Sequence, residues 1–196
     1  LPGYAAGAWG FREDTAPPPG LSMTLLVVLS LIGGAIGAGL LLVTSNEVFS
    51  IVVPWLLLAA TVLFAFGPQL RRLLAGGQAS TAKATVGVLA VAIYGGYFNG
   101  GLGILLLALF GLLGQTQLNA MNGLKNLVST LLTAIAVAVY AVGGVVNWRY
   151  ALLMMLAATA GGYIGARVAR RIPAQWLRWG IVATGLVMTG IFFARQ

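Results

Sequence analysis

The sequence predicts an all-α integral membrane protein, an inverted-repeat helical bundle with one glycine-broken helix. Hydrophobic residues make up 60% of the 196 positions and charged residues 7%. Several apolar stretches reach the roughly 20 residues that a helix needs to cross a hydrocarbon core. The segment Gly33 to Ala38 also returns, nearly unchanged, as Gly161 to Ala166, and each copy is followed by a short polar loop and a further apolar stretch. The chain is therefore predicted to contain a duplication.

The charges after the two copies indicate their orientation. The first copy continues without charge through residues 40–44, whereas the second continues with Arg167, Arg170 and Arg171. Basic residues accumulate on the cytoplasmic side of membrane proteins, so we expect the two copies to lie upside down relative to each other. Inverted repeats with broken helices are typical of secondary transporters.

The repeat divides the single membrane domain into three parts. Residues 1–67 are predicted to be the C-terminal part of a first repeat, 68–83 a cytoplasmic linker and 84–196 a second repeat. In this alignment Leu1 to Phe11 lies opposite the end of the helix near Tyr140, and nothing pairs with Lys83 to Leu127. We therefore expect the natural protein to have a further broken helix and part of a second helix before Leu1.

Local signals set the expected elements in order. Proline ends the first short helix at Pro17 to Pro19, because it lacks an N–H donor and disfavours helix in the preceding residue. Capping residues mark a polar turn at Thr44 to Glu47. Glycines interrupt the apolar stretch Lys83 to Gly114, and each weakens a helix by about 1 kcal/mol relative to alanine. The expected elements, in chain order, are an apolar fragment over Leu1 to Phe11, spans over Leu21 to Val43 and Val48 to Phe66, a basic linker over Gly67 to Lys83, the broken segment, and spans over Leu118 to Val142, Tyr150 to Ala166 and Trp176 to Ala194.

The broken segment has two possible topologies. If the linker near Arg71 and the turn near Arg170 are both cytoplasmic, an even number of crossings must join them. The segment would then be a re-entrant hairpin folded at its glycines, which is the topology that we favour. A straight crossing is the alternative, and it would place the four arginines Arg167, Arg170, Arg171 and Arg178 outside the cell.

The break itself is the first candidate binding site. It contains Asn99, Gly100, Gly101 and Gly103. Unwound backbone at membrane depth persists only where protein buries it or water reaches it, and the N-terminus of a half-helix offers N–H groups and partial positive charge to an anion. Close helix packing is the alternative interpretation, and it is the one that we assign to the Gly33 and Gly161 copies.

The polar half of the span over Leu118 to Val142 is the second candidate. Its members step by three and four positions and share one helix face: Asn119, Asn122, Asn126, Ser129 and Thr133. Lys125 borders this face, and an ionisable residue within a membrane segment is by default a functional hypothesis. In the alternative interpretation Lys125 extends to the cytoplasmic interface and the asparagines join neighbouring helices.

Composition argues against several other functions. The sequence has no cysteine and no histidine, so thiol chemistry and the common metal and acid–base roles are not expected, nor is enzymatic activity or a cofactor. The carboxylates Glu13, Asp14 and Glu47 all fall in expected loops, which leaves no buried acid for proton coupling. The net charge of +8 is spread beside apolar spans, which indicates topology and contact with anionic lipid rather than nucleic-acid binding. The five tryptophans mostly lie near expected span ends, where they would anchor the membrane interface.

Four motifs together resemble the second half of the TauE/SafE sulfite exporter family: Gly95 to Gly103, Leu118 to Asn126, Gly143 to Trp148 and Gly161 to Arg167. The resemblance covers essentially the whole chain. It implies a bacterial inner-membrane permease with two related halves that exports sulfite, sulfoacetate or other small sulfur-containing or organic anions. It supports transport of a small anion better than transport of sulfite itself.

The leading hypothesis is thus a secondary transporter of a small oxyanion that works by alternating access. Backbone donors would come from the break, amide donors from Asn119, Asn122 and Asn126, and positive charge from Lys125. A membrane scaffold or accessory subunit is a second hypothesis, in which the polar face packs against another helix instead of lining a wet cavity. An anion channel is a third. The sequence does not fix the oligomeric state, and a homo-oligomer stays open.

Overall fold

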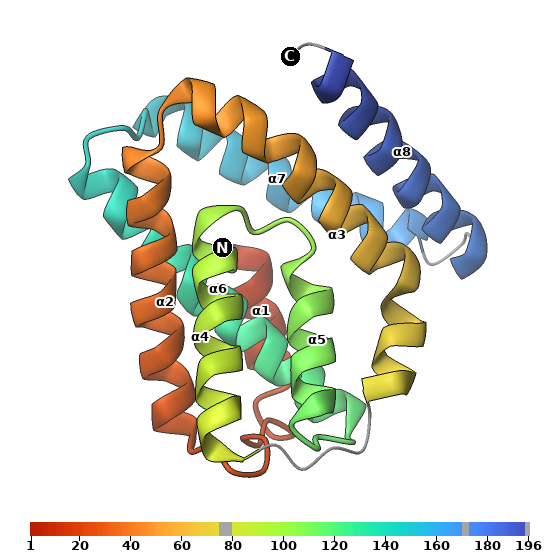
Figure 1. Cartoon of the computed structure of the whole chain (residues 1–196). Coiled ribbons are helices and arrows are strands. Elements are labelled where there is room, and N and C mark those ends of the chain that lie inside the picture. Colours follow the sequence, from red (N-terminus) through yellow and green to blue (C-terminus); the bar gives the residue numbers. More distant parts are fainter. Residues whose placement is uncertain (75–79, 170–172, 195–196) are drawn as a thin grey trace.

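A computed structural model describes residues 1–74, 80–169 and 173–194, and the ordered elements in these ranges are all α-helices (Figure 1). This agrees with the predicted all-α class. The helices, in chain order, are α1 (Pro2–Gly10), α2 (Met23–Val43), α3 (Asn46–Leu74), α4 (Thr81–Tyr97), α5 (Leu102–Leu112), α6 (Leu118–Val142), α7 (Trp148–Ala169) and α8 (Ala174–Ala194).

Four helices, α2, α4, α5 and α6, enclose the apolar core. Its largest fully buried side chains include Phe110 of α5, Leu26 of α2 and Leu124 of α6. Helix α1 packs on α6, while α3 packs on both α5 and α8 (Figure 1). The broken segment and the first half of α6 therefore lie at the centre of the described structure.

Glycines allow α2 to approach α4 until their backbones touch. A Cβ atom on Gly37 would overlap the carbonyl oxygen of Ile93 and lie 2.7 Å from the amide nitrogen of Tyr97. A Cβ atom on Gly96 would in turn overlap the carbonyl of Gly34. The first glycine copy thus has the packing role expected of small residues between membrane helices. In the second copy Gly161 faces open space, and the surroundings of Gly162 and Gly165 lie outside the description.

The predicted break in the third apolar stretch is confirmed. Helix α4 ends at Tyr97 and α5 begins at Leu102, and the two lie side by side with the connecting loop at one end (Figure 1). The chain therefore reverses direction at the glycines. Gly103 was expected in the break but belongs to the first turn of α5.

Helices extend from both sides into the segment Gly67 to Lys83, which was expected to be a linker. Helix α3 continues through Gly67 and Pro68 to Leu74, and α4 already begins at Thr81. Proline is tolerated inside membrane helices because neighbouring groups can satisfy the carbonyl that it leaves free, and α3 also contains Pro54. Residues 75–79 lie outside the described ranges.

Other boundaries shift by smaller amounts. Helix α2 begins two residues later than expected, where the Ser22 hydroxyl accepts a hydrogen bond from the Leu25 amide at 3.1 Å. The turn expected over Thr44 to Glu47 is shorter, because α3 begins at Asn46. Helices α7 and α8 start earlier than expected, and α7 reaches Ala169. The predicted turn at Arg170 and Arg171 falls outside the described residues.

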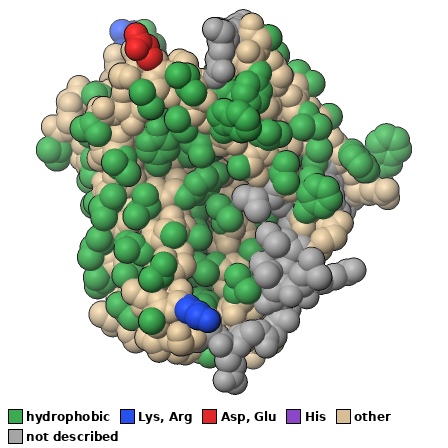
Figure 2. All heavy atoms as spheres, in the orientation of Figure 1, with side chains coloured by type: hydrophobic (Ala, Val, Ile, Leu, Met, Phe, Trp, Pro, Cys, Tyr) green, Lys and Arg blue, Asp and Glu red, His purple; other side chains and the backbone are tan. Residues whose placement is uncertain are grey.

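Two helices of the described ranges, α2 and α6, are long and apolar enough to cross a membrane. Shorter apolar segments occur over Asn46–Val62, Leu102–Leu112 and Trp179–Ala194. Figure 2 shows hydrophobic side chains spread over one face, and the charged groups visible among its described residues lie near its upper and lower ends. Such a surface suits a hydrocarbon environment rather than water.

The glycine contact between α2 and α4 can be tested with two matched substitutions. We expect Gly37→Ala to destabilise the protein by about 1–3 kcal/mol, because the added methyl group meets backbone that cannot rotate away. Gly39→Ala lies in the same helix with nothing within 4 Å of the added atom, so it should be neutral or stabilise the protein by up to about 1 kcal/mol. Thermal unfolding of both variants in detergent measures the difference. Equal melting temperatures would contradict the proposed role of Gly37.

Candidate functional site

The break between α4 and α5 is a four-residue loop with two residues in the left-handed region. Asn99 has φ 60° and Gly101 has φ 70°. Gly101 is the N-cap of α5, and no side chain caps this helix end. A Cβ atom on Gly101 would lie 3.1 Å from the Cβ of Ala60, so α3 covers the loop closely on this side. Glycine at this position therefore serves both the turn and the helix contact.

Tyr94 holds the loop in place. Its hydroxyl donates a hydrogen bond to the carbonyl of Gly100, and its ring meets Phe98 edge to face with 6.2 Å between ring centroids. The Phe98 ring also occupies the space beside Gly100, where a Cβ atom would lie 2.5 Å from it. The carbonyl of Gly100 is thus fixed in direction by a side chain from the preceding helix.

Two more tyrosines hold the C-terminal end of α4. Tyr140 of α6 donates to the carbonyl of Gly96 at 3.3 Å, and the Tyr97 hydroxyl lies 3.4 Å from Oγ1 of Thr44. The sequence interpretation named none of these tyrosines as site residues. The sequence feature that could have indicated a role for Tyr94 and Tyr97 is their position on either side of the Gly95-Gly96 pair.

Asn99 contributes an unusual group to the loop. Its side-chain oxygen Oδ1 is buried and accepts no hydrogen bond from the described part of the chain. Most buried polar side-chain atoms have a partner in protein or ordered water, so an exception of this kind requires an explanation.

Lys125 of α6 lies beside the first turn of α5. A Cβ atom on Gly103 would be 3.4 Å from Cδ of Lys125, so the aliphatic part of the lysine lies against this turn. The side chain is half-buried, and its Nζ donates to Oδ1 of Asn122 at 3.2 Å. The structure therefore brings together Gly103, Lys125 and Asn122 among the residues that the sequence analysis selected.

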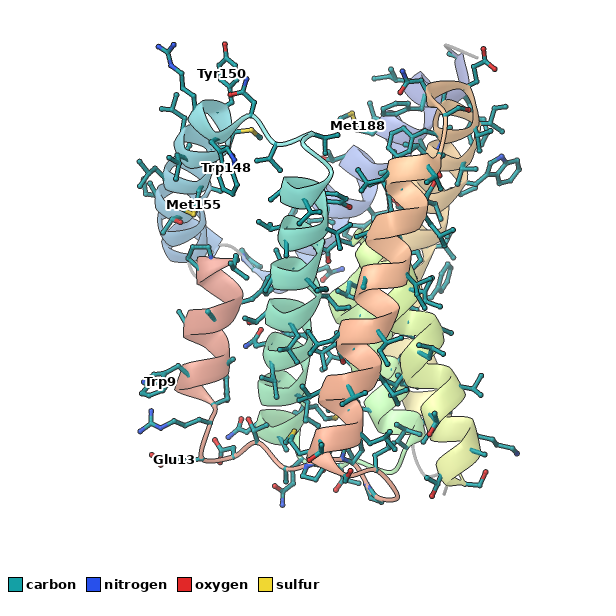
Figure 3. All side chains as sticks on the ribbon, turned by 90° about the vertical axis from the view of Figure 1, so that its left-hand side faces the viewer. Trp9, Glu13, Trp148, Tyr150, Met155 and Met188 are labelled. Atoms are coloured by element: carbon teal, nitrogen blue, oxygen red, sulfur yellow. The ribbon has the colours of Figure 1, made fainter. Side chains whose placement is uncertain are left out.

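The charge of Lys125 has no acidic partner in the described residues. The one ion pair found there joins Arg12 to Glu13. Glu13, Asp14 and Glu47 are the only carboxylates of the sequence, and all three side chains are exposed. Figure 3 shows Glu13 at one end of the structure, pointing away from the helices. A charge within a membrane helix normally pairs with an opposite charge or faces a polar cavity, so Lys125 is expected to require an anion from outside the chain.

The other residues of the polar face of α6 have different surroundings. Asn126 lies against Gly7 of α1, where a Cβ atom would be 2.5 Å from its Nδ2. Gly123 likewise faces Phe11 and Thr15. Asn119 is exposed in the first turn of α6, and Ser129 is buried. The asparagine stripe is therefore divided between the α5 side and the α1 side of the helix.

Aromatic side chains lie near both ends of the structure. Figure 3 shows Trp9 toward the end that carries Glu13, and Trp148 beside Tyr150 at the opposite end. Trp9, Trp148 and Trp176 are exposed. Trp55 packs edge to face on Phe193 of α8 at 5.2 Å between ring centroids. Exposed tryptophans near helix ends fit the role of interface anchors.

Comparison with known proteins identifies the family to which the chain belongs. No curated protein and no solved structure is significantly similar to the chain. The family described as Sulfite exporter TauE/SafE matches residues 1–192, nearly the whole length. With its apolar helices, its broken segment and this match, the chain belongs to the TauE/SafE sulfite exporter family, a family of membrane transporters.

Proposed function

We propose that the protein is a secondary transporter in a bacterial inner membrane that exports a small oxyanion, sulfite or an organosulfonate. The observation that carries the proposal is the position of Lys125, half-buried beside the break with no acidic partner in the described residues. A carboxylate-free site with a fixed positive charge favours an anionic ligand over a cation. Family membership supports transport itself.

The donors around Lys125 fit an oxyanion. Helix α5 begins next to the lysine stem. In its first turn the Leu102 and Ile104 amides donate to the carbonyls of Asn99 and Gly101, whereas the Gly103 amide donates to no group of the described residues. The N–H groups of this turn carry the positive end of the helix dipole, which favours negative charge. Asn122 already accepts from the ammonium, which leaves its amide NH₂ group available to donate to a ligand oxygen. The three sources together would replace the hydration of a small anion.

The helix directions support inverted halves. Helix α2 runs toward the end of the structure that carries Tyr150, whereas α7 starts at Tyr150 and runs away from it (Figure 3). The reversal between α4 and α5 supports placing the break as a re-entrant hairpin that enters and leaves on the cytoplasmic side (Figure 1). Movement of one half against the other would then expose the region around Lys125 alternately to the two sides.

One observation favours the scaffold hypothesis instead. Asn126 lies against α1 and Gly123 against the segment that follows α1, rather than toward the break, which is the arrangement expected of a polar face that joins helices. This packing accounts for one side of α6 and leaves the unpaired charge of Lys125 without an explanation. The transporter hypothesis accounts for both, because α1 can support α6 while Lys125 serves the site. A channel that used the same residues would differ from a carrier in its transport rate and in a flux that does not saturate.

Replacing Lys125 tests the proposal. We expect Lys125→Ala to lower saturable flux of sulfite and of methanesulfonate at least about tenfold, since hydrogen bonds to charged groups contribute about 1.5–3 kcal/mol. Flux is measured into proteoliposomes that contain the purified full-length protein, with chloride and an amine as comparison solutes. Lys83→Ala is the matched control, because Lys83 is the other lysine of the chain and is exposed at the start of α4. Flux that is absent for every anion with the natural protein would favour the scaffold, and flux that does not saturate would favour the channel.

The Tyr94 hydroxyl gives a second test, directed at the loop. We expect Tyr94→Phe to speed hydrogen exchange of the loop amides about fivefold, because the Gly100 carbonyl loses a hydrogen bond that contributes about 1 kcal/mol while the ring contact with Phe98 remains. Hydrogen-exchange mass spectrometry of the segment from Phe98 to Gly103 measures the change. Tyr97→Phe serves as control, since its hydroxyl contact of 3.4 Å is long for an O–H donor. Equal protection in both variants would show that Tyr94 does not fix the loop.

A further inference from the structure

Asn99 combines two unfavourable features at one residue of the break. Its backbone is in the left-handed region with φ 60°, which residues other than glycine seldom adopt. Its Oδ1 atom is buried without a hydrogen-bond donor from the described residues. Either feature alone destabilises the folded state, and such features cluster at ligand-binding and switch regions.

The neighbours of Asn99 show why its oxygen stays free. The adjacent carbonyl of Gly100 takes the Tyr94 hydroxyl, and the carbonyl of Asn99 itself accepts from the Leu102 amide at 3.4 Å. The carbonyl of Gly96, at the end of α4, takes the Tyr140 hydroxyl. The nearby donors thus donate to backbone carbonyls, and the side-chain oxygen of Asn99 remains a buried acceptor without a donor at the break.

A buried acceptor selects a ligand that carries a donor. Sulfite takes up a proton near neutral pH, and its hydrogen form has one O–H group and one negative charge. Methanesulfonate has the same charge and a similar head group but carries no proton at neutral pH. A ligand with the matching donor gains one hydrogen bond at this acceptor, whereas a ligand without it leaves the acceptor unsatisfied, as it is without any ligand, so the first ligand is favoured by the free energy of that one bond.

We propose that Asn99 is a specificity-determining residue that selects the protonated form of the oxyanion, with Oδ1 accepting a hydrogen bond from the O–H group of hydrogen sulfite. The inference rests on the proposed function and refines it. Lys125 lies beside the second residue of α5, and Asn99 lies three residues before this helix begins. A small ligand at the start of α5 would be neutralised by the lysine and would donate its proton to Oδ1 of Asn99. The transported species is then a hydrogen oxyanion, and each transport event moves one proton together with the anion.

Asn99→Gly is the variant that isolates the acceptor. Glycine adopts positive φ readily, so the backbone of the loop can stay as it is while Oδ1 is removed. Asn99→Asp is the second variant, since aspartate also tolerates this backbone conformation and keeps the acceptor oxygens. Asn147→Gly is the control, because Asn147 is exposed in the loop between α6 and α7.

The experiment measures sulfite and methanesulfonate flux from pH 6 to pH 8 in proteoliposomes with the full-length protein. In the natural protein sulfite flux should fall as pH rises, because the hydrogen form disappears, while methanesulfonate flux stays level. Asn99→Gly should lower sulfite flux at pH 6 about three- to tenfold and leave methanesulfonate flux within about twofold. Asn99→Asp should lower both fluxes through its charge and keep their ratio at pH 6, and Asn147→Gly should change neither.

Three results would overturn the inference, and they separate it from the proposed function. Equal losses of both substrates in Asn99→Gly, with an unchanged elution profile on size exclusion, would show that Asn99 supports the loop and does not select the ligand. Flux that depends on a sodium gradient in the natural protein and loses this dependence in Asn99→Gly, with the substrate ratio unchanged, would make Oδ1 a cation ligand instead. Absence of oxyanion flux in the natural protein would remove the proposed function and this inference together.

Discussion

The backbone contact between α2 and α4 is the constraint on which the central part of the structure depends. Helix α4 carries the break at its C-terminal end, and Gly37 and Gly96 set how closely it lies against α2. Because these contacts involve backbone atoms, neither helix can move toward the other, and side-chain rotation cannot relieve an added methyl group. The position of the loop after Tyr97 follows from this contact together with the hydroxyl of Tyr140. A membrane protein uses such small residues because apolar burial alone does not drive helices together in lipid.

The sequence was sufficient to predict features that depend on local chemistry. Helix α6 has the predicted bounds, Leu118 to Val142, since glycine-rich segments mark both of its ends. The break also follows from consecutive glycines, whose effect on a helix is local. The end of the second span at Phe66 was wrong, because Gly67 and Pro68 stop a helix in water but are tolerated within α3.

The site was less predictable because it depends on which helices meet. The spacing of Asn119, Asn122 and Asn126 predicts a common face, yet it contains no information about the neighbour on either side of that face. In the structure Asn126 meets α1 while Lys125 meets α5, although the two residues are adjacent in sequence. The role of Tyr94 was equally hidden, because its hydrogen bond to Gly100 exists only after the chain has reversed direction. The inverted orientation of the two halves and the division at residues 68–83 stay predictions.

The length of α5 has a consequence for the electrical behaviour of the protein. Its 11 residues span only about 16 Å, roughly half of a 30 Å hydrocarbon core. If water fills the space on one side of the loop, the membrane voltage falls mainly across the remaining thickness, which concentrates the electric field near the loop. A charge that moves through this thin layer then experiences most of the membrane potential over a short path. The short helix would thus make the exchange of an anion between the two sides sensitive to voltage, even though no helix has to carry a charge across the whole bilayer.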